Sequence, residues 1–156
     1  MLETDIPGFG RIEIEYLVSD FTGTLSRDGS LIRGVARLIR KVSRFLDIRV
    51  LTFDTFGTAE RELKGLPCSV LVLAGERGDG QKRDYVDRLG PERVVAIGNG
   101  VNDSLMLSLS RIGIAVVEAE GASASAVASA TLVCRDISSA LGLLLNSKRL
   151  VATLRR

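Results

Sequence analysis

The sequence predicts an α/β protein in which a doubly wound, mostly parallel sheet carries helices on both faces. Short apolar runs, typical of buried strands, alternate along the chain with longer segments of helical periodicity. This alternation favours parallel strands joined by helical crossovers. Polar residues that can take part in chemistry, among them Asp20, Thr52 and Asn99, stand at the ends of three of the expected strands. Ligands of open α/β sheets bind at that end of the strands.

The first half of the chain supplies three of the strands. Residues 12–19 alternate and then become apolar, as a strand that enters a core does. Apolar side chains recur with a helical period over residues 31–46, and an apolar strand follows over 48–53. A short helix over residues 57–65 ends at a glycine, which is a typical helix stop, and residues 69–73 form a third strand.

The second half repeats the pattern after a polar, glycine-rich loop over residues 74–80. A Gly-Pro pair ends the helix that follows this loop. The further strands are expected over residues 93–97, 112–116 and 131–134, and the helices over residues 81–89, 101–110, 121–129 and 136–146.

The length of 156 residues predicts one domain, residues 1–156, with one substantial core. Residues 1–15 are expected to form a β-hairpin, because two strand-like segments, 2–6 and 11–15, flank a Pro-Gly-Phe-Gly turn. Residues 16–134 form the core, and residues 135–156 form a C-terminal helix and tail. The Lys/Arg cluster at the C-terminus predicts a solvated tail.

Composition excludes several classes of function. The net charge of +2 is too small to indicate nucleic-acid binding. No apolar run approaches the ~18 residues that span a membrane, and the N-terminus lacks a signal sequence, so we expect a cytoplasmic protein without a membrane partner. The chain has no histidine, which excludes a histidine general base, a Ser-His-Asp triad and a histidine-bound zinc. Chemistry must therefore use Asp, Glu, Lys, Ser and Thr, with an oxygen-bound cation.

Four segments are expected to meet at the carboxyl edge of the sheet. Asp20 and Thr22 follow the first strand, Thr52 ends the second, Lys82 opens a helix, and Gly98 to Asp103 follow the fourth strand. An aspartate in the position of Asp20 can act as a nucleophile that forms an aspartyl-phosphate. Phosphoryl transfer needs little beyond such a nucleophile, cationic groups and Mg²⁺. An Asp-capped turn without chemistry is the alternative interpretation of the first segment.

These motifs resemble the phosphorylation domain of P-type ATPases, a branch of the haloacid dehalogenase-like (HAD) phosphohydrolases. The family motif DKTGTLT is matched by DFTGTLS from Asp20 to Ser26, and the TGD motif by Thr52-Phe53-Asp54. The lysine motif is matched at Lys82, and GDGxND by GNGVND from Gly98 to Asp103. The matches keep the family's order and span roughly residues 16–134.

The resemblance implies a Rossmann-like sheet of order 3-2-1-4-5, in which strands one and four are neighbours. It also implies roles for individual residues. Asp20 would be the nucleophile and a Mg²⁺ ligand. The Thr22 carbonyl and Asn99 would be further metal ligands, and Asp103 would support the metal. Thr52 would bind a phosphoryl oxygen, and Lys82 would neutralise charge on the phosphate and on Asp20.

The chain departs from the family in three ways. Asn99 replaces an aspartate of the metal motif, which should weaken Mg²⁺ binding. Thr22 stands where HAD phosphatases place an aspartate as general acid and base, and a threonine cannot protonate a poor leaving group. The segments where relatives insert a nucleotide-binding domain or a cap are short. We therefore expect a capless site that is open or covered by another subunit in a homo-oligomer.

The leading prediction is a Mg²⁺-dependent phosphohydrolase that acts on a small phosphorylated substrate through an aspartyl-phosphate at Asp20. One alternative is an autophosphorylating, P-type ATPase-like protein with slow ATP hydrolysis, whose phosphoenzyme persists because Thr22 is a poor base. The other is a non-catalytic binding or regulatory module on a HAD fold.

Overall fold

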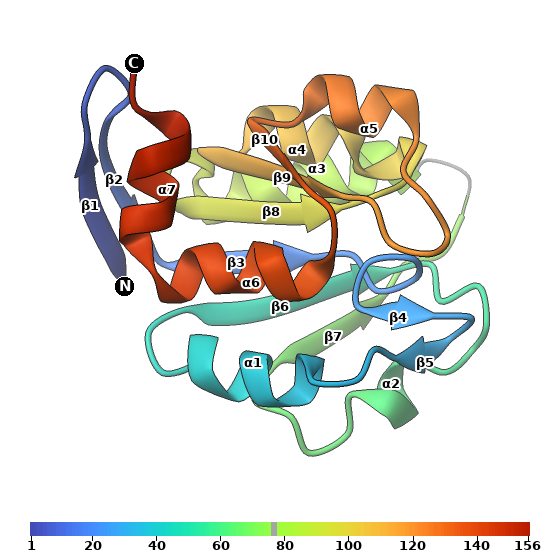
Figure 1. The fold of residues 1–156 in the computed structure, drawn as a ribbon. Helices are drawn as coiled ribbons and strands as arrows, with labels where there is room; N and C mark the ends of the chain where they lie inside the picture. The colour runs from blue at the N-terminus through green and yellow to red at the C-terminus, as the bar shows by residue number, and fades with distance from the viewer. Residues whose placement is uncertain (76–77) are drawn as a thin grey trace.

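A six-stranded parallel sheet forms the centre of the protein in a computed structural model, which describes residues 1–75 and 78–156 (Figure 1). Its strands are β3 (Tyr16–Ser19), β6 (Asp47–Thr52), β7 (Ser69–Val72), β8 (Val94–Gly98), β9 (Ile112–Val116) and β10 (Leu132–Cys134). They lie in the spatial order β10-β9-β8-β3-β6-β7, and every neighbouring pair is parallel. The predicted order 3-2-1-4-5 is confirmed, and β10 adds a sixth strand beside the fifth.

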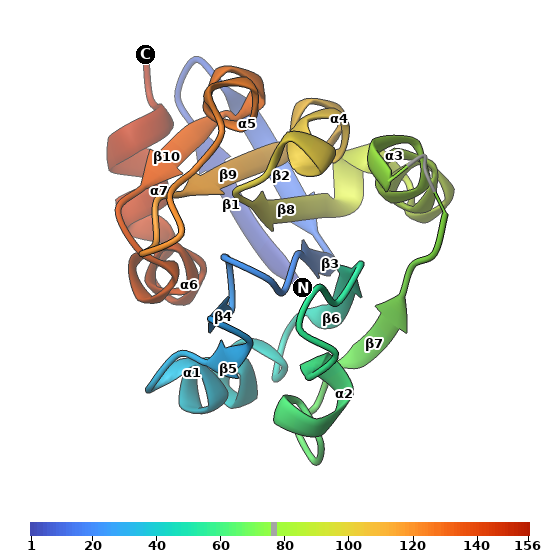
Figure 2. The same cartoon turned by 90° about the vertical axis from the view of Figure 1, so that its right-hand side faces the viewer.

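Helices cover both faces of this sheet, as predicted. Helices α1 (Val35–Val42) and α6 (Ile137–Leu145) lie on one face, and α3 (Gly78–Leu89), α4 (Ser104–Leu109) and α5 (Ala124–Ser129) lie on the other (Figure 2). Successive strand residues point to opposite faces. Leu17 of β3 accordingly packs into the core under α1 and α6, while Val18 packs into the second core under α3 and α4. Burial on both faces explains why the central strands β8 and β9 carry no polar side chain.

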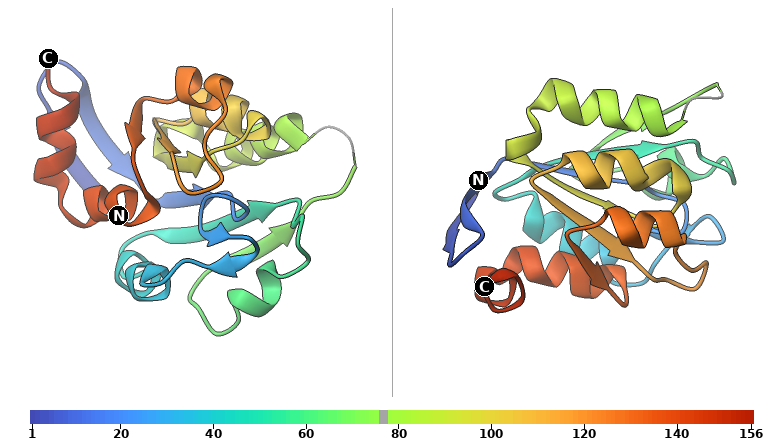
Figure 3. Two further views of the ribbon diagram at one scale, coloured as in Figure 1. Left: turned by 45° about the vertical axis from the view of Figure 1, so that its right-hand side comes forward. Right: turned by 90° about the horizontal axis from the view of Figure 1, so that it is seen from above.

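The N-terminal β-hairpin is confirmed as β1 (Leu2–Ile6) and β2 (Gly10–Ile14). Both chain termini lie at the hairpin's end of the molecule (Figures 1 and 3). The predicted C-terminal tail is instead a helix, because residues Ser147–Leu154 form α7, which packs on β1. The basic residues of this segment are exposed to solvent, as expected. Leu150 is buried and Leu154 is partly buried on the same helix face, so this segment has an apolar stripe despite its basic residues.

Several boundaries differ from the predicted ones for local reasons. The strand expected over residues 12–19 is interrupted at Glu15, so that its first part stays in the hairpin while β3 enters the core sheet. The helix expected over 31–46 begins only at Val35, because Gly34 has a φ of 89° and cannot continue a helix. The chain before it forms a small hairpin, β4 (Ser26–Arg27) and β5 (Ser30–Leu31).

The remaining connections are short. The predicted helix over 57–65 is reduced to α2 (Ala59–Glu62), and the one over 101–110 begins with a 3₁₀ turn, η2 (Val101–Asp103), before α4. A further 3₁₀ turn, η1 (Pro91–Arg93), precedes β8. Part of the predicted 74–80 loop, residues 76–77, lies outside the described residues.

No helix in the described part of the chain has the length and apolar character needed to cross a bilayer.

The topology brings two of the predicted site segments together. Strands β3 and β8 are neighbours, and Ser19 pairs with Ile97 in their register. The amide of Asp20 donates a hydrogen bond to the carbonyl of Ile97 over 2.9 Å, so Asp20 stands beside the start of the Gly98–Asp103 loop. The β4–β5 hairpin lies at this same carboxyl end of the sheet (Figure 1). The hairpin β1–β2 and helix α7 lie at the opposite end.

Candidate active site

A tight turn directly after β3 holds Asp20 at the edge of the sheet. The carbonyl of Phe21 accepts hydrogen bonds from the amides of Thr24, Leu25 and Ser26, over 3.2, 2.9 and 3.0 Å. Gly23 has a φ of 75°, and a Cβ there would stand 2.5 Å from Nδ2 of Asn99. A side chain at this position would therefore be strained and would displace the neighbouring loop. The glycine of the DFTGT run is thus required by the close approach of two loops.

A buried ion triad forms the floor of the site. Nζ of Lys82, on α3, lies 2.7 Å from Oδ1 of Asp20 and 2.7 Å from Oδ1 of Asp103. The side chains of Lys82 and Asp103 are fully buried, and Asp20 is only 5% exposed. Two carboxylates thus share one ammonium group in a region with little water, and the triad carries one excess negative charge when all three groups are ionised.

Burial and this excess charge determine the protonation of the triad. Burial first, and then repulsion from Asp103, raise the pKa of Asp20 to about 7, against the attraction of Lys82. Burial alone would lower the pKa of Lys82, but the two neighbouring carboxylates outweigh it and raise that pKa above its ordinary value. Lys82 therefore stays an ammonium ion, whereas Asp20 needs a further positive charge to be fully ionised at neutral pH.

Asp103 organises the loop that follows β8. Its second oxygen, Oδ2, accepts hydrogen bonds from the amides of Asn99 and Gly100, each over 2.9 Å. A Cβ at Gly98 would lie 2.5 Å from Cγ of Asp103, so only glycine lets the loop close over this carboxylate. Both oxygens of Asp103 are engaged by protein groups. The residue supports the site from beneath.

Oxygen atoms suited to a hard cation gather beside Asp20. The Thr24 hydroxyl lies 3.3 Å from Oδ2 of Asp20 and 3.2 Å from Oδ1 of Asn99. It has one proton and can serve only one of these two acceptors at a time. The amide nitrogen of Asn99 donates to the carbonyl of Gly121 over 3.0 Å, which leaves its oxygen beside the Thr24 hydroxyl.

The Thr22 side chain adds a polar atom without a partner. Among the described residues its buried hydroxyl has no hydrogen-bond partner, and the residue lines the same pocket. Over residues 1–75 and 78–156, no three carboxylate, histidine or cysteine side chains converge on one point. A cation held here would therefore need amide or backbone oxygens besides Asp20, a set that suits Mg²⁺, which retains several waters.

Thr52 contributes a hydroxyl to the opposite wall. Its side chain is fully buried, and its Oγ1 accepts a hydrogen bond from the amide of Asp54 over 2.9 Å, which leaves the hydroxyl proton to be donated. Asp54 has a φ of 50° and turns away from the site, because its Oδ1 accepts the amides of Thr58 and Ala59 at the start of α2. The segment from Thr52 to Asp54 thus orients the Thr52 hydroxyl and caps the start of α2.

A pocket of about 220 Å³ opens above the triad. It is lined by Asp20, Thr22, Thr52, Phe53, Thr55, Asn99, Gly100, Asn102 and Glu120. The structure therefore brings together Asp20, Thr22, Thr52 and Asn99 around one pocket, with Lys82 and Asp103 beneath it. Sequence reasoning missed Thr24, although it lies within the DFTGT run, and Glu120, which no motif indicated.

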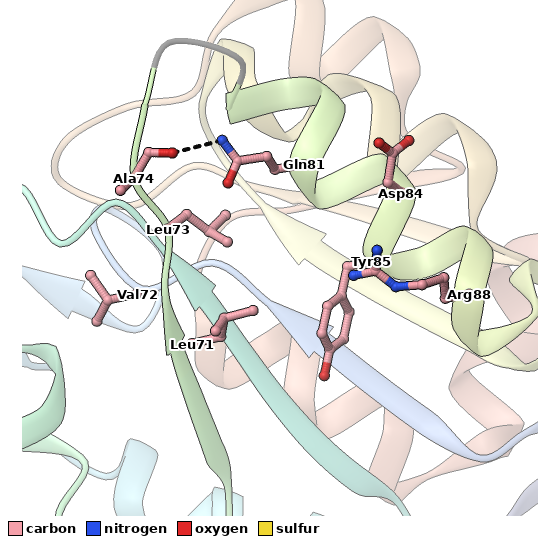
Figure 4. Close-up of a pocket in the computed structure, with 8 residues that line it drawn as sticks. All are labelled: Leu71, Val72, Leu73, Ala74, Gln81, Asp84, Tyr85 and Arg88. Carbon is pink, nitrogen blue, oxygen red and sulfur yellow. Dashed lines mark hydrogen bonds between the residues drawn. The ribbon is translucent and has the colours of Figure 1, made fainter.

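A larger groove of about 380 Å³ lies elsewhere, between the edge strand β7 and helix α3 (Figure 4). Leu71 and Tyr85 line it, and the Gln81 side chain closes one end with a hydrogen bond to the carbonyl of Ala74 over 2.9 Å. None of the predicted site residues line this groove. The candidate site is therefore the smaller pocket, which the predicted residues line.

Known structures share this architecture. The chain resembles the 3-deoxy-D-manno-octulosonate 8-phosphate phosphatase of Moraxella catarrhalis, a structure in complex with magnesium, phosphate and KDO, with 15% identity and a TM-score of 0.70 over 91% of this chain and 94% of that one. A Streptomyces avermitilis protein assigned to the HAD family of hydrolases gives 24% identity and a TM-score of 0.66 over 92% and 85%. The catalytic domain of the CPx-ATPase CopB-B gives 24% identity and a TM-score of 0.57 over 72% of this chain and 44% of that one.

These likenesses confirm that the chain has the HAD-like fold, which the CPx-ATPase catalytic domain shares. No protein-family profile matches the chain. An uncharacterized protein of Methanocaldococcus jannaschii is 47% identical over 64 residues, which are 41% of this chain and 69% of that protein. The chain belongs to the same family as this archaeal protein.

Proposed function

We propose that the protein is a Mg²⁺-dependent phosphohydrolase that transfers the phosphoryl group of a small phosphorylated substrate to Asp20 and then to water. One observation carries the proposal. The ammonium of Lys82 lies 2.7 Å from both Asp20 and Asp103, directly beneath a pocket that presents hydroxyl groups and an amide oxygen. A buried lysine held this way costs desolvation energy, and a purely structural core would be built more simply from apolar side chains.

The residues of the pocket divide the work of the first step. A carboxylate oxygen of Asp20 bonds to phosphorus while the bond from phosphorus to the leaving oxygen breaks, which yields an aspartyl-phosphate and the free leaving group. The Thr52 hydroxyl donates a hydrogen bond to a phosphoryl oxygen. Lys82 favours the ionised form of Asp20 and offsets negative charge that gathers above the triad.

A divalent cation fits the oxygen-rich side of the pocket. Asp20, the Thr22 carbonyl and Asn99 would hold it, with Asp103 fixing the loop that carries Asn99. When bound, Mg²⁺ supplies the positive charge that neutralises phosphate oxygens and lowers the barrier to their approach. The donor set contains one carboxylate and otherwise neutral oxygens, so we expect weak binding.

Thr22 limits the second step, in which water attacks phosphorus and inorganic phosphate leaves Asp20. A threonine hydroxyl does not accept a proton at neutral pH, so water is not activated there. Leaving groups that need protonation are disfavoured in the first step for the same reason. We therefore propose substrates with good leaving groups, such as acyl or aryl phosphates.

The test is direct detection of the intermediate. The protein is exposed to ³²P-labelled acetyl phosphate with Mg²⁺, quenched in acid and treated with hydroxylamine, which releases acyl-phosphate. We expect label on the wild-type protein and none on Asp20→Asn, a variant that keeps the shape of the side chain. Equal label on both proteins would refute the role of Asp20.

The ATPase-like alternative is favoured by the same Thr22. If [γ-³²P]ATP labels Asp20 and the label persists while acetyl phosphate labels nothing, the protein is an autophosphorylating relative of P-type ATPases. If neither donor labels the wild-type protein and no substrate releases phosphate, the non-catalytic binding module is the better description.

A further inference from the structure

Glu120 brings an additional carboxylate to the rim of the active-site pocket. It lies in the loop between β9 and α5, is exposed to solvent, and lines the pocket together with Asp20 and Asn99. Its Oε1 accepts a hydrogen bond from the amide of Asp28, at the tip of the β4–β5 hairpin, over 2.8 Å. One carboxylate oxygen is thus engaged in holding that hairpin.

The second oxygen of Glu120 lies close to Gly23, in the turn that follows Asp20. A Cβ built on Gly23 would stand 3.0 Å from Oε2 of Glu120 and 2.5 Å from Nδ2 of Asn99, so both groups approach the same point. The charge of Glu120 is therefore beside the residue that replaces an aspartate in the metal motif. Segments separated by some twenty residues in the chain meet here because β8 and β9 are adjacent strands.

The charges around the pocket can be compared with and without this carboxylate. Lys82 supplies one positive charge, whereas Asp20, Asp103 and Glu120 supply three negative charges when all are ionised. Such a pocket repels a phosphate ester and attracts a divalent cation. An aspartate at position 99 without Glu120 would give the same total. Glu120 thus restores the charge that Asn99 lacks.

We propose that Glu120 is a positioning residue for Mg²⁺. Its carboxylate would accept hydrogen bonds from water on the metal and so compensate for the neutral Asn99. The inference rests on the proposed function, because it concerns the metal of that same site. Mg²⁺ keeps several of its waters in proteins, and a nearby carboxylate accepts their hydrogen bonds. Outer-shell partners of this kind typically change metal affinity by about 10–100-fold.

A role in tethering the hairpin alone would have different consequences. Glu120→Gln keeps an oxygen that accepts the Asp28 amide but removes the charge. Glu118→Gln is the matched control, because Glu118 lies in the same loop and its Oε1 accepts the amide of Ile137 over 2.7 Å, at the start of α6. Both variants lose one charge and retain an acceptor, but only Glu120 lines the pocket.

The experiment is calorimetric titration of the full chain with MgCl₂, without substrate, after removal of metal with EDTA. Glu120→Gln should weaken Mg²⁺ binding by about 10-fold, as loss of an outer-shell partner does. Glu118→Gln should bind Mg²⁺ like the wild type. Introducing Asn99→Asp into Glu120→Gln should restore the affinity of the wild type, because it returns the charge to the pocket.

Three results would overturn the inference: unchanged Mg²⁺ affinity in Glu120→Gln, an equal loss in Glu118→Gln, or no recovery in the double variant. Thermal melts in EDTA establish that every variant is folded. If the wild type binds Mg²⁺ and forms the aspartyl-phosphate while Glu120→Gln behaves normally, only the role of Glu120 fails. If the wild type binds no Mg²⁺, the metal dependence of the proposed function fails together with it.

Discussion

Replacing Lys82 by methionine should destabilise the protein strongly. Methionine has a similar length and tolerates burial, so the change removes the charge and leaves little cavity. Asp20 and Asp103 then lie buried without their common partner, and Lys82 itself is fully inaccessible to solvent. Breaking a buried ion pair on one side typically costs about 3–5 kcal/mol. In a chain of 156 residues this corresponds to a fall in Tm of roughly 6–20 °C.

The stability lost in Lys82→Met should depend on pH, and the pKa of Asp20 determines whether it grows or shrinks as the pH rises. Burial and then Asp103 already raise the pKa of this carboxyl to about 7 in the folded protein, above its ordinary value of 3.8. A carboxyl whose pKa is higher in the folded than in the unfolded protein stabilises the fold fully at a pH below its unfolded pKa. This stabilisation is lost as the pH rises through its folded pKa. Without Lys82 the folded pKa rises further, so Lys82→Met should be more destabilising at pH 8 than at pH 5.

The assay is urea unfolding of the metal-free protein in EDTA, followed by circular dichroism at pH 5 and pH 8. Lys64→Met, at an exposed position after α2, is the matched control and should change the free energy of unfolding by less than about 0.5 kcal/mol. Adding Asp103→Asn to Lys82→Met should recover part of the loss, since it removes one unpaired charge. A loss under about 1 kcal/mol at pH 8, or an equal loss at both pH values, would refute the buried triad as an energetic unit.

Two further outcomes are expected. Thr22 lines the pocket, and among the described residues its buried hydroxyl has no hydrogen-bond partner. Thr22→Asp should speed hydrolysis of alkyl phosphates by up to about 10²–10⁴-fold and shorten the life of the phosphoenzyme. Stopped-flow phosphate release measures both rates, and an unchanged dephosphorylation rate would count against this role. The chain should also form a homo-oligomer that covers the open pocket, and light scattering that gives the mass of a monomer at working concentration would exclude this arrangement.

Much of the architecture was predictable because it depends on local patterns. The alternation of apolar runs and helical periods located the strands, and the strand-end positions of Asp20, Thr52 and Asn99 predicted one shared edge. The C-terminal helix α7 was missed because its basic residues dominate the composition. The apolar stripe of α7 is buried only because it packs on β1, which is far away in the sequence.

The chain alone therefore determines which residues end strands, which turns require glycine and which ionisable groups are available. The contacts among these groups were decided by the tertiary structure, because they join residues far apart in the sequence. The ion pair of Lys82 with Asp20 spans 62 positions, and the hydrogen bond of Glu120 to Asp28 spans 92. Burial of the triad, which raises the pKa of Asp20, follows from the helices packed around it, and no local pattern encodes that loss of solvent.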